Sequence, residues 1–319
     1  MQFVKMHGIG NDYVYINGFE QPIDDPASLA VQISDRHFGV GADGLILVLP
    51  PDNCGLGPGG NSGPALAPTA TESSNGSKAH VRMRIFNADG SEAEMCGNGI
   101  RCVCKFAHDR NLVTANPMRV QTVNGVLTLE YTTDASGKVD EVTVDMGEPV
   151  LEPERIPVKI GGLPHIVNHS TRSLIEWPAN AEQGWEAECS LDQQMTCVSM
   201  GNPHAIFFCG HVERVPLEIV GPVVERHLVF PNRTNVHFVT VHRPGEVTMR
   251  TWERGSGVTL ACGTGASAVC VAGQLTGRAD RHVTAHLPGG DLDLCWNEEN
   301  NHVYMTGPAT EVYTGEWDR

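Results

Sequence analysis

A motif that occurs twice constrains this chain more than any other feature of its sequence. Residues 89–104 read DGSEAEMCGNGIRCVC, and residues 254–270 read RGSGVTLACGTGASAVC. Each copy has Gly-Ser, then four or five residues, then Cys-Gly-x-Gly and an apolar pattern typical of a helix. The two cysteines, Cys96 and Cys262, lie 166 residues apart, about half of the 319-residue chain. The repeat therefore predicts a duplicated domain with one such cysteine in each half.

The remaining pattern predicts a mixed α/β chain. Runs of β-branched and aromatic residues, separated by glycine, asparagine and aspartate turns, favour strands that pair largely as antiparallel hairpins. We expect strands at 3–18 (two, joined by a turn), 44–49, 81–86, 118–122, 126–131, 141–146, 195–199, 205–209, 236–241 and 247–252, and further strands at the end. We expect helices at 26–37, 100–108 and about 263–275, with the last two beginning at or just after a cysteine, and a domain boundary at 146–150, where the patterning restarts.

Two segments depart from this pattern. Residues 50–79 are rich in glycine, proline and small polar residues, a composition that buries little apolar surface, and they predict an irregular surface insertion. Cys54 lies inside that insertion, and we assign it no role. Residues 161–192 predict an elaborated connection within the second half.

Composition excludes several classes of partner. The chain has 22 Lys and Arg against 38 Asp and Glu, a net charge of −16, which disfavours nucleic acid and which we assign to solubility. No run approaches the roughly 20 apolar residues that cross a bilayer, and the first residues lack the pattern of a signal peptide. We therefore expect a cytoplasmic protein whose ten cysteines are thiols rather than disulfides.

The position of the paired cysteines suggests acid–base chemistry. Each is followed by glycines and then by a predicted helix, whose first turn offers unpaired N–H groups and a partial positive charge. Thiols at helix N-termini ionise more readily than ordinary thiols, and the same N–H groups can hold a carboxylate. Two such thiols, one from each half, predict racemisation or epimerisation without pyridoxal phosphate, with one cysteine as thiolate base and the other as thiol acid.

Competing interpretations of these residues are weaker. Cys96, Cys102 and Cys104 form Cys-x5-Cys-x-Cys, which lacks the paired short spacing of zinc sites. No Gly-x-Ser-x-Gly elbow supports a serine hydrolase, and His7–Gly10 is a lone Gly-x-Gly without the third glycine of nucleotide-binding loops. The remaining cysteines are expected to be small core residues. They are Cys102, Cys104, Cys189, Cys197, Cys209, Cys270 and Cys295.

Eight stretches, in one order along nearly the whole chain, make the sequence resemble the diaminopimelate epimerase family. They are Lys5–Tyr13, Gly39–Gly44, Phe86–Ser91, Met95–Cys102, Ser199–His204, Arg233–Asn235, Trp252–Gly255 and Ala261–Ala266. The resemblance implies an isomerase of lysine and peptidoglycan precursor biosynthesis that converts LL-diaminopimelate to the meso isomer without cofactor or metal. It implies two pseudo-symmetric domains, 1–145 with 308–319 and 146–307, each a curved mixed sheet wrapped around a central helix, with the active site between them.

The resemblance also assigns roles to single residues. Cys96 and Cys262 fall on the catalytic cysteines, which agrees with the repeat. The implied substrate-binding residues are Asn11, Asn87, Gly97, Asn98, Asn202, Asn235, Glu253, Arg254, Gly263 and Thr264. His204 and Glu253 occupy positions that tune the pKa of the thiols. At Gly44 the side chain that some relatives use for substrate contact is absent, so we assign that position no role.

Two other functions stay open from the sequence. A proline or hydroxyproline racemase shares the two-cysteine logic, but its first motif reads Cys-Gly-His, whereas Cys96 is followed by Gly97 and Asn98. A binding protein that kept the fold without thiol chemistry would not need both cysteines. Thiols that flank one carbon also predict a Cys96–Cys262 disulfide on oxidation of the empty site. Whether the chain forms a homodimer stays open.

Overall fold

The computed structural model describes residues 1–52, 78–93, 96–178, 181 and 184–318. Most of the predicted insertion at 50–79, Cys54 included, lies outside the described residues. Contacts within the chain separate two units. Unit 1 comprises Met1–Gly8, Asp12–Val142 and Pro308–Arg319, and unit 2 comprises Ile9–Asn11 and Thr143–Gly307. The sequence predicts domain boundaries near 145 and 308. That the parts on either side of these boundaries fold independently stays a prediction.

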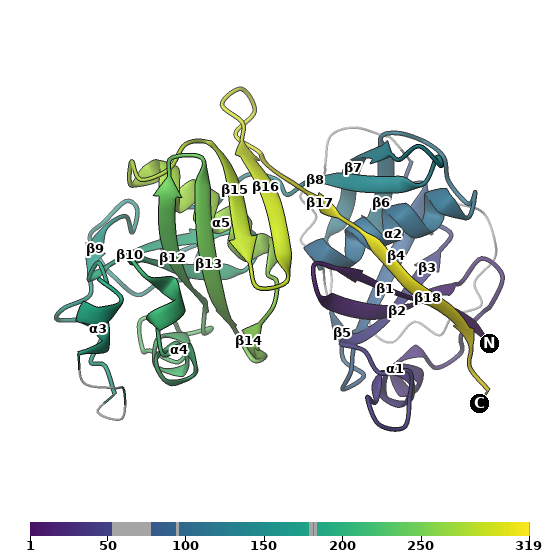
Figure 1. Cartoon of the computed structure of the whole chain (residues 1–319), viewed down its shortest axis with the longest axis horizontal. Coiled ribbons are helices and arrows are strands. Elements are labelled where there is room, and N and C mark those ends of the chain that lie inside the picture. Colours follow the sequence, from purple (N-terminus) through teal and green to yellow (C-terminus); the bar gives the residue numbers. More distant parts are fainter. Residues whose placement is uncertain (53–77, 94–95, 179–180, 182–183, 319) are drawn as a thin grey trace. The chain divides into compact units, whose positions relative to one another are not determined.

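Unit 1 is a mixed sheet with two helices (Figure 1). Its elements are β1 (Gln2–Gly8), β2 (Asn11–Asn17), α1 (Pro26–Ser34), β3 (Gly44–Leu49), β4 (Val81–Asn87), β5 (Glu92–Ala93), α2 (Gly97–Asp109), β6 (Met118–Thr122), β7 (Gly125–Thr133) and β18 (Thr310–Glu316). β18 pairs with β1, β1 with β2, β2 with β3 in parallel, and β3 with β4 antiparallel. β4 pairs with β5 antiparallel and with β6 in parallel, and β6 with β7 antiparallel.

Unit 2 is also a mixed sheet, with α5 as its long helix (Figure 1). Its elements are β9 (His169–Ser170), α3 (Trp185–Glu188), β10 (Gln194–Ser199), β11 (Pro203–Phe208), a 3-10 turn η1 (Val212–Arg214), α4 (Leu217–Glu225), β12 (Asn235–Arg243), β13 (Glu246–Glu253), β14 (Gly257–Thr259), α5 (Gly263–Leu275), β15 (His282–Leu287) and β16 (Gly290–Trp296). The chain enters unit 2 along β8 (Val139–Asp145) and returns along β17 (Val303–Pro308), which pair with each other.

The two units repeat one topology. In unit 2, β10 pairs with β11 antiparallel, β11 with β12 in parallel, and β12 with β13 antiparallel. β13 then pairs with the short β14 antiparallel and with β15 in parallel, and β15 with β16 antiparallel. This is the order of β1 to β7, with α1 and α4 at one equivalent place and α2 and α5 at another. The duplication predicted from one motif thus extends over every element around it.

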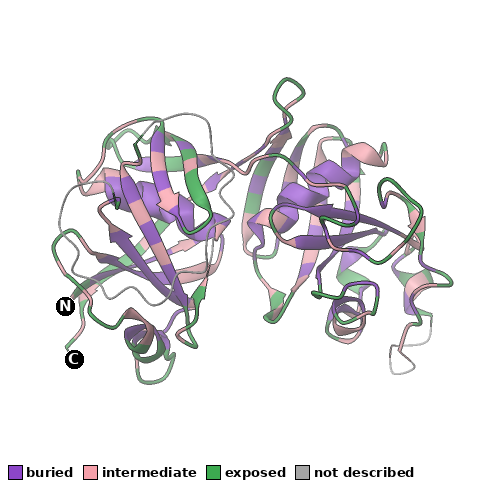
Figure 2. Cartoon of the chain, turned by 180° about the vertical axis from the view of Figure 1, so that it is seen from behind, coloured by how far each residue is buried: buried purple, intermediate pink, exposed green. Residues whose placement is uncertain are grey.

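Each sheet surrounds one buried helix. Helix α2 contacts β1, β3, β4, β6 and β7, and α5 contacts β10, β11, β12, β15 and β16. Figure 2 shows both helices mostly in the colour of buried residues, and ten residues of α5, from Gly263 to Gly273, are buried. Helix α5 consists almost entirely of small and apolar residues, as a helix buried on all sides requires, whereas α2 also buries the polar side chains of Asn98, Arg101 and Lys105. The predicted fold class, curved mixed sheets around central helices, is confirmed.

Both helices begin directly after their cysteines, as predicted. Helix α5 begins at Gly263, the expected position, and α2 begins at Gly97, three residues before the expected segment 100–108. The cysteine itself is the capping residue in both cases, so the glycines form the first turn. Helix α4, which contains Pro222, was not predicted, because proline inside a segment normally argues against a helix.

The connection at 161–192 is largely irregular, as predicted, but it contributes to the core of unit 2. It contains only the two-residue β9 and the single turn α3, apart from the residues outside the description. Its apolar side chains Ile166, Ile175 and Trp185 are buried in one cluster with Phe207 and Phe238. Burial of these side chains holds the connection against the sheet.

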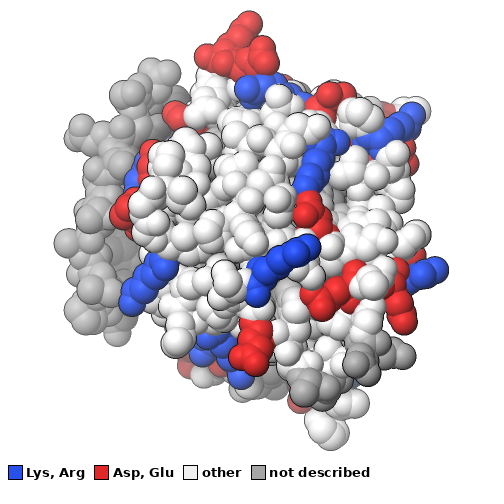
Figure 3. All heavy atoms as spheres, turned by 90° about the vertical axis from the view of Figure 1, so that its left-hand side faces the viewer, with Lys and Arg blue, Asp and Glu red and all other residues white. Residues whose placement is uncertain are grey.

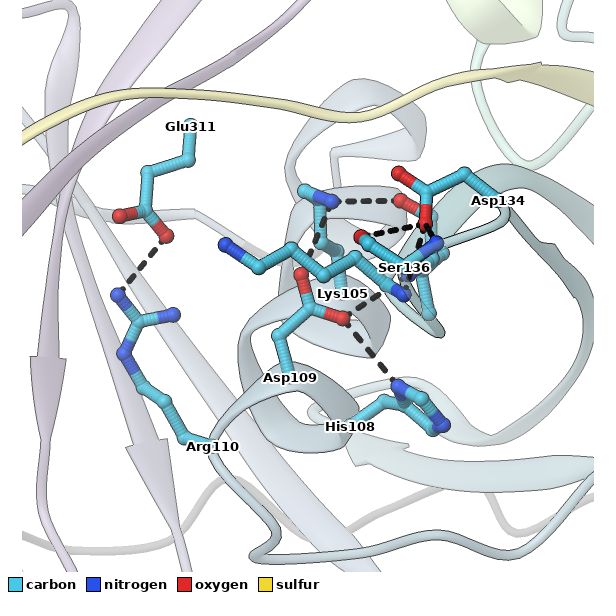
Figure 4. Close-up of polar contacts among 9 residues, drawn as sticks. Lys105, His108, Asp109, Arg110, Asp134, Ser136 and Glu311 are labelled. Carbon is cyan, nitrogen blue, oxygen red and sulfur yellow. Dashed lines mark hydrogen bonds and ion pairs between the residues drawn. The ribbon is translucent and has the colours of Figure 1, made fainter.

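Polar contacts anchor the C-terminal end of α2 (Figure 4). Lys105 pairs with Asp109 at 2.9 Å, one turn apart, and its Nζ donates to Val139 O at 2.5 Å. Asp109 Oδ1 accepts from Val139 N at 2.9 Å. Arg110 pairs with Glu311 of β18 at 2.9 Å. The helix that begins at Cys96 is therefore held at its far end by charged groups.

The surface carries charges of both signs. On the face of unit 2 seen in Figure 3, Lys and Arg side chains lie among Asp and Glu side chains rather than in a patch of one sign. No helix in the described part of the chain is both long and apolar enough to cross a membrane.

Candidate active site

Cys96 and Cys262 occupy equivalent positions in the two units. Each is the N-cap of a 13-residue helix, and each has an extended backbone, with φ −137° and ψ 113° at Cys96 and φ −138° and ψ 101° at Cys262. Each follows a short strand, β5 or β14, that pairs with a long one. The likeness of the two sequence motifs is thus a likeness of backbone conformation.

The sulfur of Cys96 faces the first turn of α2. Gly99 N lies 3.3 Å from Cys96 Sγ and donates to it, so the thiol acts as the side-chain cap of the helix. An N–H donor and the positive end of the helix dipole both favour a thiolate there. Gly99 is required sterically, because a Cβ at this position would lie 2.7 Å from Ile46 Cδ1. Cys96 is half-buried, so its sulfur is not sealed in the core.

Cys262 is 5% exposed, and one of its contacts is to a residue of α5. The Thr264 hydroxyl lies 3.7 Å from Cys262 Sγ. The third helical residue is again glycine, and here a Cβ on Gly265 would lie 2.3 Å from His237 Cε1. The Cys-Gly-x-Gly pattern therefore has one physical reason in both units: the helix start packs too closely on its sheet for a side chain at the second glycine.

The other predicted residues of unit 1 lie near these elements. Gly97 and Asn98 are buried in the first turn of α2, next to Cys96. Asn87 ends β4, and its Nδ2 donates to Ser91 Oγ at 3.0 Å. Gly44 pairs with Asn87 in the sheet, and a Cβ there would lie 2.1 Å from Phe86 O. The absence of a side chain at position 44 thus follows from packing.

The predicted residues of unit 2 form a connected group. Asn202 Oδ1 lies 2.8 Å from His204 Nε2, and His204 pairs with Asn235 in the parallel ladder of β11 and β12. Asn235 Oδ1 accepts from Arg254 N at 2.9 Å, and its Nδ2 donates to Pro203 O at 3.0 Å. Asn235 therefore joins β11 to the end of β13.

The charged pair at the end of β13 is held from two sides. The Thr259 hydroxyl donates to Glu253 Oε1 at 2.5 Å. Arg254 is exposed, and its Nη1 donates to Asn232 O at 3.1 Å. Asn11, at the start of β2, is half-buried and belongs to unit 2 by its contacts. The site residues thus fall into one set on each unit, and both sets include a helix N-terminus.

Most of the remaining cysteines are buried, as Cys262 is, whereas Cys96 is half-buried. Burial raises the pKa of Cys102 to about 11, and of Cys104 and Cys270 to about 12. Cys189, Cys197 and Cys209 are also buried, as predicted for core residues, while Cys295 is half-buried. Among the residues that the structure describes, no three His, Cys, Asp or Glu side chains come together as a metal ion would need.

Comparison with known proteins connects this geometry to a family. The sequence matches the diaminopimelate epimerase family over residues 3–152 and 196–312. The chain belongs to the diaminopimelate epimerase family. Among curated members, the diaminopimelate epimerase of Acetivibrio thermocellus is 46% identical over 318 residues, covering 100% of this chain and 99% of that protein. That of Methanococcus maripaludis is 45% identical, with 100% of both covered. The predicted family is therefore confirmed.

Solved structures extend the fold beyond the diaminopimelate epimerase family. A phenazine biosynthesis protein of the PhzF family from Bacillus anthracis matches with a TM-score of 0.64 at 13% identity, covering 100% of this chain and 99% of that one. A hydroxyproline epimerase from Agrobacterium vitis matches with a TM-score of 0.57 at 16% identity, covering 99% and 90%. At such identities the likeness concerns the fold alone.

Arg101 is a residue that the sequence analysis quoted inside a family stretch but gave no role. It is fully buried in α2, where its Nε donates to Pro308 O at 3.1 Å and its Nη1 to Gly97 O at 3.2 Å. Burial lowers the pKa of Arg101, and the neighbouring Cys102 and Cys96 thiols raise it in part. Its signal was available: a cation five residues after Cys96, in a helix predicted to be apolar.

Tyr15 is a second residue that sequence reasoning missed. Its hydroxyl donates to Gly99 O at 3.2 Å, and the N–H of the same residue donates to Cys96 Sγ. Burial raises the pKa of Tyr15 well above its usual value, and the Cys102 and Cys96 thiols add to this. Tyr15 therefore stays protonated, and its hydroxyl donates to the first turn of α2. A tyrosine in a β-rich segment carries no signal that distinguishes it from a core residue.

Proposed function

We propose that this chain interconverts LL-diaminopimelate and meso-diaminopimelate by moving one α-proton between Cys96 and Cys262. The observation that carries the proposal is the matched pair of N-cap cysteines, one at the head of each duplicated helix, in a member of the diaminopimelate epimerase family. The reaction needs two groups that act on opposite faces of one carbon, and the duplication supplies two equivalent ones.

The chemistry follows from the two thiols. One cysteine, as thiolate, takes the α-proton from one face, and the other, as thiol, gives a proton to the opposite face, so the configuration inverts. The C–H electron pair stays on the carbon and its carboxylate until the second proton arrives. For the reverse reaction the two cysteines exchange roles, and no cofactor enters the cycle.

Helix N-termini assist this step. The N–H groups of the first turns of α2 and α5 can hold the substrate carboxylate next to the reacting carbon, where negative charge develops. Gly97, Asn98, Gly263 and Thr264 are the residues of those turns that we assign to substrate binding. A pyridine cofactor is not needed if these donors and the cysteines together stabilise the carbanion-like transition state.

The second amino-acid end of diaminopimelate needs recognition without reaction. We assign its carboxylate to the guanidinium of Arg254, which can bind both oxygens, and its ammonium to the carboxylate of Glu253. Asparagine amides both donate and accept, and we place Asn11, Asn87, Asn202 and Asn235 around the same substrate. We also assign to His204 and Glu253 a part in setting the ionisation of the thiols.

The proposal is tested by proton NMR of the reduced protein in D2O. Loss of one α-proton signal of LL-diaminopimelate, together with growth of the meso isomer, is the expected result. The same measurement with L-proline and hydroxyproline examines the racemase alternative. Loss of the α-proton signal on those substrates alone would assign the chain a proline or hydroxyproline racemase activity instead. Absence of exchange on all three would reject epimerase chemistry on these substrates.

The setting of the reaction completes the proposal. Lysine and peptidoglycan precursors are made in the cytoplasm, so we propose that location, which fractionation of cells into cytoplasm and membrane tests directly. A homodimer is the alternative to a monomer as the state in solution. Sedimentation equilibrium over a range of concentrations distinguishes the two, since the monomer has a mass of 34.4 kDa.

A further inference from the structure

Four side chains of unit 2 form a continuous hydrogen-bonded chain, and two of them, Thr251 and His237, have no part in the proposed reaction. Thr251 Oγ1 lies 2.9 Å from His237 Nδ1, His237 Nε2 lies 2.8 Å from His204 Nδ1, and His204 Nε2 lies 2.8 Å from Asn202 Oδ1. Both histidines are fully buried, Thr251 is 2% exposed, and Asn202 is half-buried. The chain therefore runs from the core of unit 2 to a residue that we assign to substrate binding.

Sheet register brings these residues together. His237 of β12 lies directly opposite Thr251 of β13, and His204 lies on the neighbouring strand β11. Helix α5 closes the other side, since a Cβ on Gly265 would lie 2.3 Å from the His237 ring. The His237 ring thus packs closely against Gly265, which follows Cys262 by three residues in the sequence.

Both rings are neutral at the pH of the cytoplasm. Burial lowers the pKa of His237 to about 3. Burial also lowers the pKa of His204 well below its usual value, and the nearby His237 and Arg254 lower it further. A neutral imidazole has one N–H and one lone pair, so each ring can donate on one side and must accept on the other.

The contact at Asn202 shows the direction of the whole hydrogen-bonded chain. Its Oδ1 can only accept, so His204 carries its proton on Nε2, and His204 Nδ1 is then an acceptor. His237 must therefore donate from Nε2, which leaves His237 Nδ1 to accept from the Thr251 hydroxyl. Every donor and acceptor in the chain is matched in this arrangement, with both histidines in the Nε2–H form.

We propose that Thr251 and His237 are positioning residues that act through His204 to hold the Asn202 amide in one orientation, with its oxygen toward the chain and its NH2 turned to donate to a carboxylate of the substrate. The inference rests on the proposed function for the identity of that ligand. An amide turned the other way would present its oxygen to the carboxylate and repel it. The hydrogen-bonded chain of side chains thus determines that Asn202 binds the carboxylate of an amino acid rather than its ammonium group.

The first test reads the tautomers directly and needs no activity. Histidine is labelled with 15N in the full chain, and the ring signals of His204 and His237 are identified by comparison with H204Q and H237Q. We expect a proton on Nε2 and a lone pair on Nδ1 in both rings, unchanged from pH 6 to pH 8. A proton on Nδ1 of either ring, or titration of either ring in that range, overturns the proposal.

The second test removes the hydroxyl that begins the chain. Thr251→Val keeps the shape of the side chain but leaves His237 Nδ1 without its donor, and Thr251→Ser restores it. We expect T251V to raise KM for LL-diaminopimelate by about 10-fold with kcat changed by less than about 3-fold, because ground-state and transition-state binding lose the same contact. T251S should return KM to within about 2-fold of the original value.

Two results of the second test contradict the positioning role. One is a T251V variant with the original KM and the original tautomers, and the other is a failure of T251S to restore KM. If the wild-type chain does not act on diaminopimelate at all, the proposed function fails, whereas the tautomer measurement still tests the chain of hydrogen bonds. If T251V does not fold, the histidine tautomers in the 15N spectrum of the wild-type protein alone test the proposal.

Discussion

At residues 96 and 262 a cysteine ends an extended segment and begins a helix, and this local geometry is what makes the thiol useful. Both sulfurs lie at the positive end of a helix dipole, and Cys96 Sγ also accepts from Gly99 N, while a sulfur inside the helix receives neither. Cys104 and Cys270 illustrate the second case, because burial raises the pKa of both to about 12. Position in the helix, rather than residue type, separates the two kinds of cysteine.

Substitution of the N-cap cysteines should abolish activity. We expect C96A and C262A each to lower kcat for LL-diaminopimelate by at least about 10²–10⁴-fold, the range of a lost general acid or base. C104A and C270A, in the same two helices, are the matched controls and should change kcat by less than about 3-fold while losing about 1 kcal/mol of stability. Equal kcat for C96A and the wild type would remove Cys96 from the mechanism.

At this scale the sequence predicted the cysteines but not their neighbours. A motif that occurs twice can be recognised from the sequence, so Cys96 and Cys262 could be found without a structure. The contacts of His237 with Thr251 and of Tyr15 with Gly99 depend on strand register and on helix–sheet packing, which a single sequence does not encode in any short pattern.

Among the elements, α2 depends on buried polar contacts at both ends. Arg101 connects its first turn to Pro308, and Lys105 with Asp109 holds its last turn against Val139. Arg110, at the C-terminal end of α2, forms an ion pair with Glu311 that is partly exposed. Buried and exposed cations should therefore contribute very differently to stability.

Removal of Arg101 should destabilise the protein more than removal of Arg110. We expect R101M to lower the free energy of unfolding by about 2–4 kcal/mol, because it leaves buried carbonyls without a donor. R110M should cost only about 1 kcal/mol, since exposed ion pairs are weak. Urea denaturation measures both, and an equal loss in the two variants would contradict this account of α2.

Asp109 should make stability depend on pH in acid. Burial alone would raise its pKa, but the Val139 amide, Lys105 and His108 outweigh burial and hold the pKa below its ordinary value. The native state therefore binds its proton later than the unfolded chain, so this stabilisation is complete above about pH 4 and is lost as pH falls through the native pKa.

The variant D109N tests this dependence. It keeps an oxygen for the Val139 amide but loses the charge, so we expect it to be about 1–3 kcal/mol less stable than the wild type at pH 7. The difference should shrink as the pH falls below about 4, because the unfolded wild-type chain binds the proton there and the native carboxylate binds it only at lower pH. Urea denaturation at pH 7 and pH 3 checks it, and a difference that stays constant would assign the effect to packing instead.

Most elements could be predicted, and the failures share a cause. Strands such as Gly44–Leu49 and Met118–Thr122 were found at their observed positions because their apolar runs end in clear turn signals. Helix α2 begins three residues before the expected segment because tertiary packing overrides the low helix propensity of glycine. Helix α4 was missed because its buried contacts outweigh the cost of Pro222.

For the whole molecule, the central fact is a topology used twice. Each unit orders its strands in the same way around a buried helix whose N-cap is a cysteine. A duplicated unit gives two equivalent thiols, and inversion of one carbon needs two equivalent groups. One repeated motif sufficed to predict the duplication, but the equivalence of β1–β7 with β10–β16 came only from the ladder pairings.

Oxidation should link the two units if both thiols act on one carbon. We expect hydrogen peroxide to inactivate the substrate-free protein by forming a Cys96–Cys262 disulfide, with two thiols oxidised and peroxide reduced to water. Peptide mass spectrometry should find the cross-link, dithiothreitol should restore activity, and bound substrate should protect. Full activity after peroxide, without added reductant, would argue against adjacent thiols.

The central claim is that two different cysteines handle the two protons, and the fate of hydrogen in D2O tests it most directly. Protiated LL-diaminopimelate is mixed with reduced protein in D2O, and the isotope at the inverted carbon is measured by mass spectrometry before the reaction has gone far. We predict that all newly formed meso isomer carries deuterium there, because the donating thiol has exchanged with solvent, while the remaining LL isomer keeps its protium. Protium at the inverted carbon of the product would mean that a single base returns the proton it removed, and would contradict the two-cysteine account.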